Sequence, residues 1–393
     1  MSSKDVVICG AARTPIGSFQ GAFSSLSASD LGGVAVAEAV KRSGAKPEDV
    51  ERAILGNVLP AAMGQAPARQ AVIKAGLPVS VGAITVNKVC GSGLQAVMFA
   101  RREILVGDAD VLVAGGMESM TNAPYALPNA RGGYRMGNGK IIDTMIHDGL
   151  WDPYDDMHMG NCGDMVAAKY GFSREDQDAF AAASYERALA AQKEGRFKEE
   201  IVPVTVKGRK GDTLVDQDEE PGRGQIDKMS GLRPAFSKEG TVTAANASTI
   251  NDGAAALVVA SAETAKARGY NVLARIVADA TAAVEPKWFT IAPVHALAKL
   301  YEKTKTKPLD WDLYEINEAF SGVTMAAMKE HGLPHERVNV NGGAVALGHP
   351  IGCSGARLLV TLIHSLRQRG EKNGIATLCI GGGEAVALAV ELV

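Results

Sequence analysis

The sequence predicts an α/β fold in which a duplicated, layered core is interrupted by one long inserted segment. Three observations support this prediction. Residues 1–119 alternate short β-branched runs with Ala-rich helical stretches, the same alternation returns at residue 251, and two segments more than 200 residues apart resemble each other. Alternating strands and helices are typical of layered α/β domains, and a repeat of this length indicates a duplicated domain.

The first block predicts four strands and three helices. Short runs enriched in Val and Ile indicate strands, and Ala-rich runs with helical spacing indicate helices. The expected strands are residues 5–11, 51–59, 84–89 and 108–116, and the expected helices are residues 31–44, 68–76 and 94–107. Because strands that alternate with helices usually pair in parallel, we expect a mainly parallel sheet.

The middle of the chain follows a different pattern. Residues 121–140 are rich in Gly, Pro and Asn, and an amphipathic helix at 174–195 is followed by a polar loop at 207–224. These features predict an inserted α/β loop domain, residues 120–247. It would interrupt an N-terminal half, residues 1–119 plus 248–272, which is followed by a C-terminal half, residues 273–393.

The duplication is clearest at two glycine-serine turns. One stretch, "CGSGLQAVMFARREIL", begins at Cys90, and the other, "GCSGARLLVTLIHSLRQ", begins at Gly352. Each continues through a helix and an apolar strand to a glycine cluster that ends at Glu118 or Glu384. Cys90 therefore aligns with Gly352, so the two turns need not do the same work.

Composition and charge argue against several classes of protein. Apolar residues make up 46% and charged residues 22% of the 393 residues, as in ordinary globular proteins. A formal net charge of −3 offers no overall positive field for nucleic acid or an anionic membrane. No apolar run approaches the ~20 residues that cross a bilayer, and we expect no signal or transit peptide.

The cysteines favour a reducing compartment. They are five in number, widely spaced, and without a C-x-x-C pair: Cys9, Cys90, Cys162, Cys353 and Cys379. This pattern argues against a disulfide framework and against a structural zinc site. We therefore expect a cytoplasmic protein.

Cys90 has two interpretations. It fills a small apolar gap where strand meets helix, or it is a reactive thiol at a helix N-terminus. In the second case Gly91 and Gly93 let the backbone turn tightly, and the free N–H groups of the helix favour a thiolate and bind an oxyanion. The local pattern alone does not decide between them.

Three further elements place polar groups at strand ends. His349 lies between glycines and a proline, Cys379 precedes three glycines, and Asn317 and Glu318 occupy an otherwise apolar junction. Taken singly, these are a structural histidine, a core cysteine and a helix N-cap. Together they indicate a site, because open α/β sheets build their sites on loops at strand ends.

Five stretches resemble the signatures of the thiolase family. They are "NKVCGSGLQA", "GTVTAANASTINDGAAA", "NEAF", "NGGAVALGHPIGCSGAR" and "CIGGGEA", and the likeness runs in order from residue 5 to 393. Within the family the chain looks most like the acetyl-CoA C-acetyltransferases. The resemblance implies a five-layered αβαβα fold, a homotetramer arranged as a dimer of dimers, and acetyl-CoA, acetoacetyl-CoA and CoA as substrates and products, with no separate cofactor.

The resemblance also implies roles for individual residues. Cys90 would be the nucleophile, His349 the base that activates it, and Cys379 the acid/base that exchanges a proton with C2 of the acetyl group. Asn317 would hold a water that, with His349, stabilises the enolate, and the N–H groups of Cys90 and Gly381 would bind the acyl oxyanion. Removal of a weakly acidic α-proton needs both a base and an oxyanion site.

For CoA, the resemblance points to two groups of residues. Ser248, Ala319 and Phe320 would line the pantetheine path. The inserted segment would contribute Leu150, His158, Met159, Arg223 and Phe236. Because the chain is acidic overall, we expect the nucleotide end to be loosely held.

The chain departs from the family pattern at two places. Residues 285–293 are closest to mitochondrial-type enzymes that accept a 2-methyl branch, but Thr290 stands where those have proline, which leaves branch acceptance open. Those enzymes also bind potassium through backbone carbonyls, which would here belong to Ala244, Ala245, Ala247 and Val345. Pro221 replaces the tyrosine that completes that site.

Rival functions remain at this point. A degradative 3-ketoacyl-CoA thiolase would act on longer chains, although Trp288, Phe289 and Thr290 favour a short pocket. A ketosynthase typically has a second histidine in place of Cys379. A non-catalytic acyl-CoA-binding or lipid-binding protein would tolerate loss of the thiols.

Overall fold

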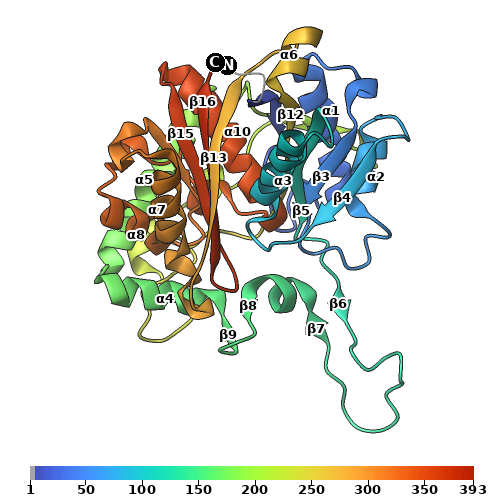
Figure 1. The fold of residues 1–393 in the computed structure, drawn as a ribbon. Coiled ribbons are helices and arrows are strands. Elements are labelled where there is room, and N and C mark those ends of the chain that lie inside the picture. Colours follow the sequence, from blue (N-terminus) through green and yellow to red (C-terminus); the bar gives the residue numbers. More distant parts are fainter. Residues whose placement is uncertain (1–4) are drawn as a thin grey trace.

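The computed structural model describes residues 5–393, and one ten-stranded sheet runs through its core (Figure 1). Within those residues the strands lie in the order β14 (Leu313–Ile316), β15 (Asn373–Ile380), β16 (Glu384–Leu392), β13 (Ala274–Ala283), β1 (Val6–Arg13), β12 (Asn251–Ser261), β5 (Val111–Ser119), β3 (Arg52–Gly56) and β4 (Gly82–Val86), with β2 (Gly17–Ser18) paired to β12. The two halves join where Val7 and Ile8 of β1 pair with Arg275 and Ala274 of β13.

The expectation of a mainly parallel sheet is wrong. β3 is parallel to both β4 and β5, and β14 is parallel to β15. However, β12 runs antiparallel to both β1 and β5, and β16 runs antiparallel to β13 and β15. β12 follows the inserted segment in the chain and runs antiparallel to its neighbours in the sheet. The pattern of residues 1–119 therefore could not predict it.

The hydrogen-bonded sheet forms two layers, β14-β15-β16-β13 in the C-terminal half and β1-β12-β5-β3-β4 in the N-terminal half, with α3 (Ser92–Val106) and α10 (Ile351–Arg369) between them (Figure 1). Together with three layers of helices, they make up the expected five-layered fold. The outer helices of the N-terminal half are α1 (Ala28–Ser43) and α2 (Pro67–Lys74), those of the C-terminal half are α7 (Ala292–Thr304) and α8 (Ser321–His331), and the central pair is α3 and α10. Separate apolar clusters fill the spaces: one around α1 and α2, one around α7, and one that joins α3 and α10 to both halves.

Helix α10 is buried on every side, although its sequence includes polar residues such as Arg357 and His364. All residues from Ile351 to Leu366 are buried, as expected of a helix between two sheets. Small residues let it approach α3 closely. A methyl group added to Gly93 would lie 2.8 Å from the backbone nitrogen of Ala356, and one added to Gly355 would lie 2.5 Å from that of Leu94. The first turns of α3 and α10 therefore pack directly on each other.

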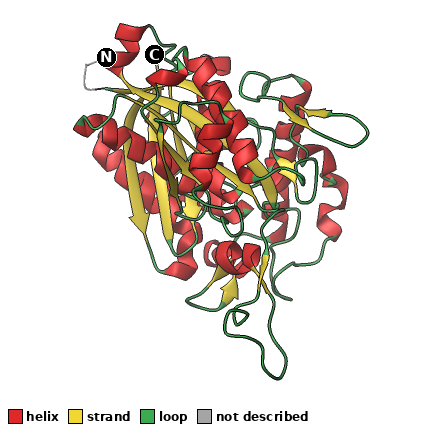
Figure 2. Ribbon diagram, turned by 90° about the vertical axis from the view of Figure 1, so that its right-hand side faces the viewer, coloured by secondary structure: helices red, strands yellow, loops and turns green. Residues whose placement is uncertain are grey.

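The inserted segment contributes no strand to the large sheet. It carries the helices α4 (Met159–Tyr170) and α5 (Arg174–Lys193), a five-residue helix at Ile146–Leu150, and the short pairs β6–β7 (Tyr125–Ala126, Ile142–Asp143), β8–β9 (Trp151–Asp152, Met157–His158) and β10–β11 (Val204–Val206, Thr213–Val215). The β6–β7 arm projects away from the body in two views (Figures 1 and 2). The exact domain boundaries stay a prediction.

Shorter helices complete the chain. They are α6 (Ala262–Arg268), α9 (Ala344–Leu347) and the single-turn helices Pro47–Asp49, Pro221–Arg223, Ile226–Gly231, Pro286–Ile291, Pro308–Asp310 and His335–Arg337. Across the described part of the chain, every helix is too short or too polar to cross a membrane.

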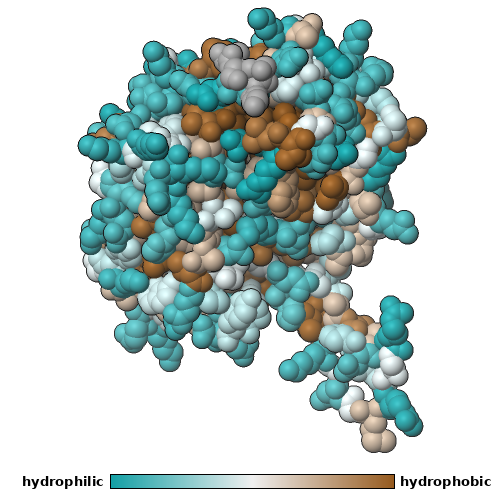
Figure 3. Space-filling view, in the orientation of Figure 1, coloured by the Kyte–Doolittle hydropathy of each residue, from teal (hydrophilic) through white to brown (hydrophobic). Residues whose placement is uncertain are grey.

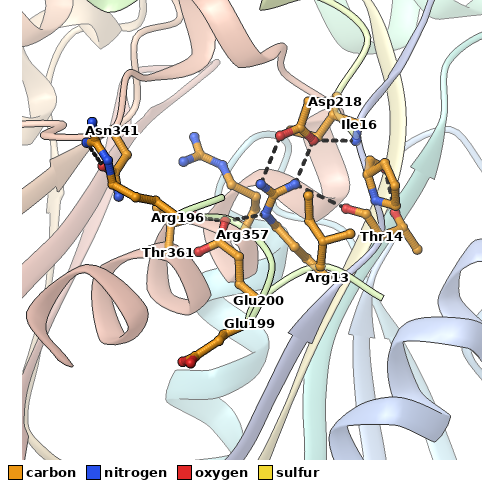
Figure 4. Close-up of polar contacts among 12 residues, drawn as sticks. Arg13, Thr14, Ile16, Arg196, Glu199, Glu200, Asp218, Asn341, Arg357 and Thr361 are labelled. Atoms are coloured by element: carbon orange, nitrogen blue, oxygen red, sulfur yellow. Dashed lines mark hydrogen bonds and ion pairs between the residues drawn. The ribbon is translucent and has the colours of Figure 1, made fainter. Parts of the chain in front are cut away.

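A buried ionic network fastens the inserted segment to the core (Figure 4). The guanidinium of Arg13, on β1, donates to Glu200 Oε1 at 2.6 Å and to both carboxylate oxygens of Asp218 at 2.7 and 2.9 Å. Thr361 of α10 donates to the same oxygen of Glu200 at 3.2 Å. Removing one partner of a buried ion pair leaves the other charge uncompensated, which costs about 3–5 kcal/mol.

Candidate active site

Cys90 lies on the turn between β4 and α3. The helix begins at Ser92 with Gly91 as its N-cap, so the thiol stands just before the free N–H groups of the first turn, as predicted. The backbone N–H of Lys88 donates to Ser92 Oγ at 2.8 Å, and that hydroxyl donates to Val89 O at 2.6 Å. These two bonds close the turn around a buried cysteine.

The glycines beside Cys90 serve packing rather than turning, which corrects the expectation. Gly91 has a φ of −77°, which any residue adopts. A methyl group on it would lie 2.3 Å from Cδ1 of Ile380, so the absence of a side chain allows close contact with β15. The left-handed residue is instead Val89, with φ of 45°. A β-branched residue rarely adopts this conformation, and the surrounding contacts hold it.

The end of β15 brings a second thiol to the same place. The backbone N–H of Gly381 lowers the pKa of Cys90, and a charge on Cys90 raises the pKa of Cys379, so Gly381 and both thiols are neighbours. Burial raises the pKa of Cys90 to about 11, although the N–H groups of Gly381 and Cys90 lower it, and burial raises the pKa of Cys379 well above its usual value. The expected preference for a thiolate at rest is therefore wrong, because burial outweighs the helix terminus.

His349 stands directly before α10, and its imidazole is held in one tautomer. Its backbone N–H donates to Asn251 Oδ1 at 2.9 Å. Ser354 Oγ lies 2.5 Å from Nδ1 and donates its proton to Pro350 O at 2.9 Å. With the hydroxyl proton directed to Pro350 O, Nδ1 donates to Ser354 Oγ, and Nε2 is the acceptor that faces Nδ2 of Asn317.

His349 is neutral in this environment. Burial, together with the positive charge of Arg357, lowers its pKa to about 3. Nδ2 of Asn317 lies 3.3 Å from Nε2. Because the first turns of α3 and α10 pack together, Cys90 and His349 each lie next to the contact between these two helices.

Asn317 belongs to the site and is not a helix N-cap, since α8 begins at Ser321 with Phe320 as its cap. Its backbone N–H donates to Thr377 O at 3.0 Å, two residues before Cys379. Its side chain is fully buried, and Oδ1 has no hydrogen-bond partner among the residues that the structure describes. A buried acceptor of this kind is suited to an ordered water.

The neighbouring Glu318 braces the loop that leads to His349. This buried carboxylate accepts hydrogen bonds from Ser184 Oγ at 2.7 Å, Asn339 Nδ2 at 2.7 Å and the N–H of Val345 at 3.1 Å. The inserted helix α5, which carries Ser184, is therefore joined to the histidine loop.

Most residues expected to bind CoA form one apolar wall. Met159, Ala319, Phe320 and Cys379 belong to a single cluster, against which Phe236 packs. His158 stacks on Phe236 with ring centroids 4.7 Å apart, and the N–H of Ser248 donates to Ala319 O at 3.0 Å. Leu150 packs instead against the central core that contains Cys90.

Arg223 lies apart from that wall. It is exposed and lines a 360 Å³ cavity with Ala244, Ala245 and Thr249, the residue after Ser248. For the predicted potassium site, Val345 belongs to an apolar cluster on which Ala245 packs, whereas Ala247 pairs with Phe320. Pro221 is buried and offers no hydroxyl, so potassium binding stays a prediction.

Sequence reasoning missed several residues that contact the site. Asn251, Ser354 and Glu118 had no assigned role, although each lies inside a stretch that carries the family resemblance or the duplication. Asn251 and Ser354 contact His349 directly. Ser354 follows His349 by five residues and lies in the first turn of a helix. This spacing was the sequence feature that could have indicated the tautomer of the imidazole.

Comparisons with known proteins agree with this geometry. Residues 6–263 match the thiolase N-terminal domain, and residues 270–392 match the thiolase C-terminal domain. An acetyl-CoA acetyltransferase of Cupriavidus necator is 54% identical over 389 residues, covering 98% of this chain and 99% of that protein. Acetyl-CoA acetyltransferase 2 of Arabidopsis thaliana is 51% identical over 395 residues, covering 100% and 98%.

A solved structure shows the same fold. The Bacillus anthracis acetyl-CoA acetyltransferase superposes with a TM-score of 0.97 at 44% identity and covers 99% of both chains. Two thiols and a histidine converge from two duplicated halves, and both halves match the same family along nearly their whole length. The chain therefore belongs to the thiolase family.

Proposed function

We propose that the chain is an acetyl-CoA C-acetyltransferase, which condenses two acetyl-CoA reversibly to acetoacetyl-CoA and CoA through an acetyl-Cys90 intermediate. The observation that carries this proposal is the pair of neighbouring buried thiols, one from each half, with the N–H of Gly381 close enough to lower the pKa of Cys90. Full-length relatives at 51–54% identity bear the name acetyl-CoA acetyltransferase.

In the first half-reaction the Cys90 thiol gives its proton to Nε2 of His349. The thiolate attacks the carbonyl carbon of acetyl-CoA, and the N–H groups of Cys90 and Gly381 bind the oxyanion. The carbon–sulfur bond to CoA then breaks, and Cys379 protonates the departing CoA thiolate. Removing one such oxyanion donor typically costs about 10²–10³ in rate.

In the second half-reaction the Cys379 thiolate takes a proton from C2 of a second acetyl-CoA. Protonated His349 and a water held by Asn317 stabilise the enolate oxygen. C2 attacks the acetyl-Cys90 carbonyl, the bond to Cys90 sulfur breaks, and His349 returns its proton to Cys90. Every proton is then back at its starting atom.

The pKa values suit this sequence. Burial raises the pKa of both thiols and lowers that of His349 to about 3, so the resting site is neutral. Charges form only as pairs: first the Cys90 thiolate with the His349 imidazolium and then, once the acetyl group has been transferred, the Cys379 thiolate with the same imidazolium. A site that rests neutral disfavours unproductive thiolate chemistry.

We also propose a homotetramer in the cytoplasm. Apolar side chains are exposed on α3 and on the edge strand β4, at Phe99, Leu105, Val106 and Ile84, and Figure 3 shows apolar atoms gathered over α3. Exposed apolar patches at a sheet edge favour association with another chain. All five cysteines are free, which suits a reducing compartment.

A chain-length series tests the function. We expect CoA-dependent thiolysis to be fastest with acetoacetyl-CoA and to fall as the 3-ketoacyl chain grows, and we expect acetoacetyl-CoA to form from acetyl-CoA alone. Faster cleavage of long 3-ketoacyl-CoA than of acetoacetyl-CoA would replace the proposal with a degradative thiolase. Binding without turnover would indicate a non-catalytic protein.

A further inference from the structure

Glu118, at the end of β5, is a buried carboxylate in contact with four donors. Its Oε1 accepts from Asn57 Nδ2 at 2.6 Å and from the N–H of Leu59 at 3.2 Å. Its Oε2 accepts from the N–H groups of Val58 at 2.9 Å and Gly352 at 2.8 Å. Its side chain is inaccessible to water.

The donors require the ionised form of this carboxylate. Four N–H groups point at two oxygens, so a proton on either oxygen would face a donor. Burial raises the pKa of Glu118 to about 7, and the hydrogen bonds from these same donors oppose that rise. The titratable groups that interact with its charge are Cys90 and Cys353.

The four bonds join the turn that carries Cys90 to the turn that carries His349. On one side, the N–H of Asn57 donates to Val86 O at 3.0 Å and Asn87 Nδ2 donates to Val58 O at 3.3 Å, so the 57–59 loop is fastened just ahead of Cys90. On the other side, Gly352 and the Ser354 that holds the imidazole share the first turn of α10.

The contact leaves no freedom at Gly352. A methyl group there would lie 2.5 Å from Glu118 Oε2 and 2.9 Å from Met117 O. The carboxylate thus fills the space in which the aligned position of the other half, Cys90, carries its side chain.

We propose that Glu118 is a positioning residue for the acetyl-transfer reaction: as an ionised carboxylate it holds His349 in reach of Cys90 by fixing the first turn of α10 against the 57–59 loop. The inference rests on the proposed function, since it assigns Glu118 a part in that reaction. We expect Glu118 to affect kcat and not substrate binding. Ser248, Ala319 and Phe320, which would line the pantetheine path, form none of the four hydrogen bonds to Glu118.

Glu118→Gln tests this assignment, with Glu384→Gln as the matched control. The substituted amide keeps the shape of the carboxylate but places an NH₂ group against donors. Glu384 is the aligned carboxylate of the other half and forms only a partly exposed ion pair with Lys88. The assay is thiolysis of acetoacetyl-CoA, with kcat expressed per Cys90 that can be alkylated by iodoacetamide, so that loss of folded protein does not count.

We expect Glu118→Gln to lower kcat at least about tenfold, equivalent to ~1.4 kcal/mol of barrier, with KM within about twofold of the wild type. Glu384→Gln should keep kcat within about twofold. A kcat loss smaller than about tenfold in Glu118→Gln, or an equal loss in both variants, overturns the assignment. An inactive wild type would instead contradict the proposed function.

Asn57→Ala decides the matter if Glu118→Gln does not fold. It removes the 2.6 Å donor and leaves the carboxylate in place. We expect a kcat loss of at least about threefold at unchanged KM, as the Glu118–loop contact weakens. A smaller loss, or a rise in KM alone, contradicts the inference.

Discussion

The turns before α3 and before α10 occupy equivalent places in a duplicated fold, and each has a serine that donates to a carbonyl before the helix, but their other contacts differ. The first carries a cysteine whose pKa is lowered by an N–H group of the opposite half, and the second carries a glycine whose N–H donates to a carboxylate of the opposite half. Glu118 is buried with four donors, whereas its counterpart Glu384 is partly exposed and pairs with Lys88.

Under the proposed function, one site is built from both copies. The N-terminal half then supplies the nucleophile, and the C-terminal half supplies the histidine, the asparagine and the second thiol. Because the first turns of α3 and α10 pack closely, one turn has room for a side chain, and the other can make only a backbone contact. The predictions below separate the two turns, beginning with the largest expected effect.

Replacing the cysteine of the first turn should abolish most activity, whereas replacing that of the second turn should not. Cys90→Ser should lower acetyl transfer by more than about 10⁴-fold, because a hydroxyl has a far higher pKa than a thiol. Cys353→Ala, in the opposite turn, should retain most activity. Steady-state thiolysis measures both, and comparable losses in the two variants would mean that the first turn is not special.

Cys379→Ser should separate the two half-reactions. Acetyl-Cys90 should still form, but exchange of the acetyl C2 protons with deuterated solvent and condensation should slow by about 10²–10⁴, the usual contribution of a general acid/base. Mass spectrometry of the adduct and NMR of the exchanged acetyl group measure the two steps. Equal slowing of both steps would assign Cys379 a structural role.

Filling the glycine of the second turn should damage stability. Gly352→Ala places a methyl group 2.5 Å from Glu118 Oε2, and overpacking of this kind costs about 1–3 kcal/mol. Denaturant unfolding should show that loss in the free energy of unfolding. Gly222→Ala, at an open position with nothing near the added methyl group, is the control. Equal stability of the two variants would show that the second turn has room for a side chain.

His349, just before α10, and His364, within α10, are both buried but should have different roles. We expect His349 to act in acetyl transfer and His364 to affect only the pH dependence of stability. Burial lowers the pKa of His364 to about 4, so between about pH 4 and 6.5 the unfolded chain binds a proton that the folded chain does not. Stability should therefore fall as the pH drops through this window. His364→Leu should reduce the loss between pH 7 and pH 5 by about 1–2 kcal/mol and leave acetyl transfer intact. An unchanged pH dependence would mean that His364 is solvated.

Much of the fold and of the candidate site could be predicted from the sequence, because both depend largely on local sequence patterns. The alternation of strands and helices indicated the layers. The resemblance indicated Cys90, His349, Cys379 and Asn317, of which the structure places Asn317 beside His349 and Cys379 near Cys90; their catalytic roles stay a prediction. What could not be predicted depends on distant contacts. The antiparallel β12 pairs with strands more than 100 residues away in the chain.

The roles of the small residues could not be predicted either, because they too depend on contacts between segments distant in the sequence. Gly91 appeared to serve a turn, but it makes room for Ile380, and the left-handed residue is Val89. Glu118 appeared only as the end of a glycine cluster. Its four donors come from two segments that the sequence separates widely, and no spacing rule joins them.

The most direct test of the account is to locate the acetyl group after the wild-type protein is mixed with acetyl-CoA and quenched in acid. The account predicts one acetyl group per chain, on the peptide that contains Cys90, and its disappearance when free CoA is added before the quench. An acetyl group on Cys379 or Cys353, or no covalent adduct while acetoacetyl-CoA still forms, would contradict the central claim that the two halves build one site around Cys90.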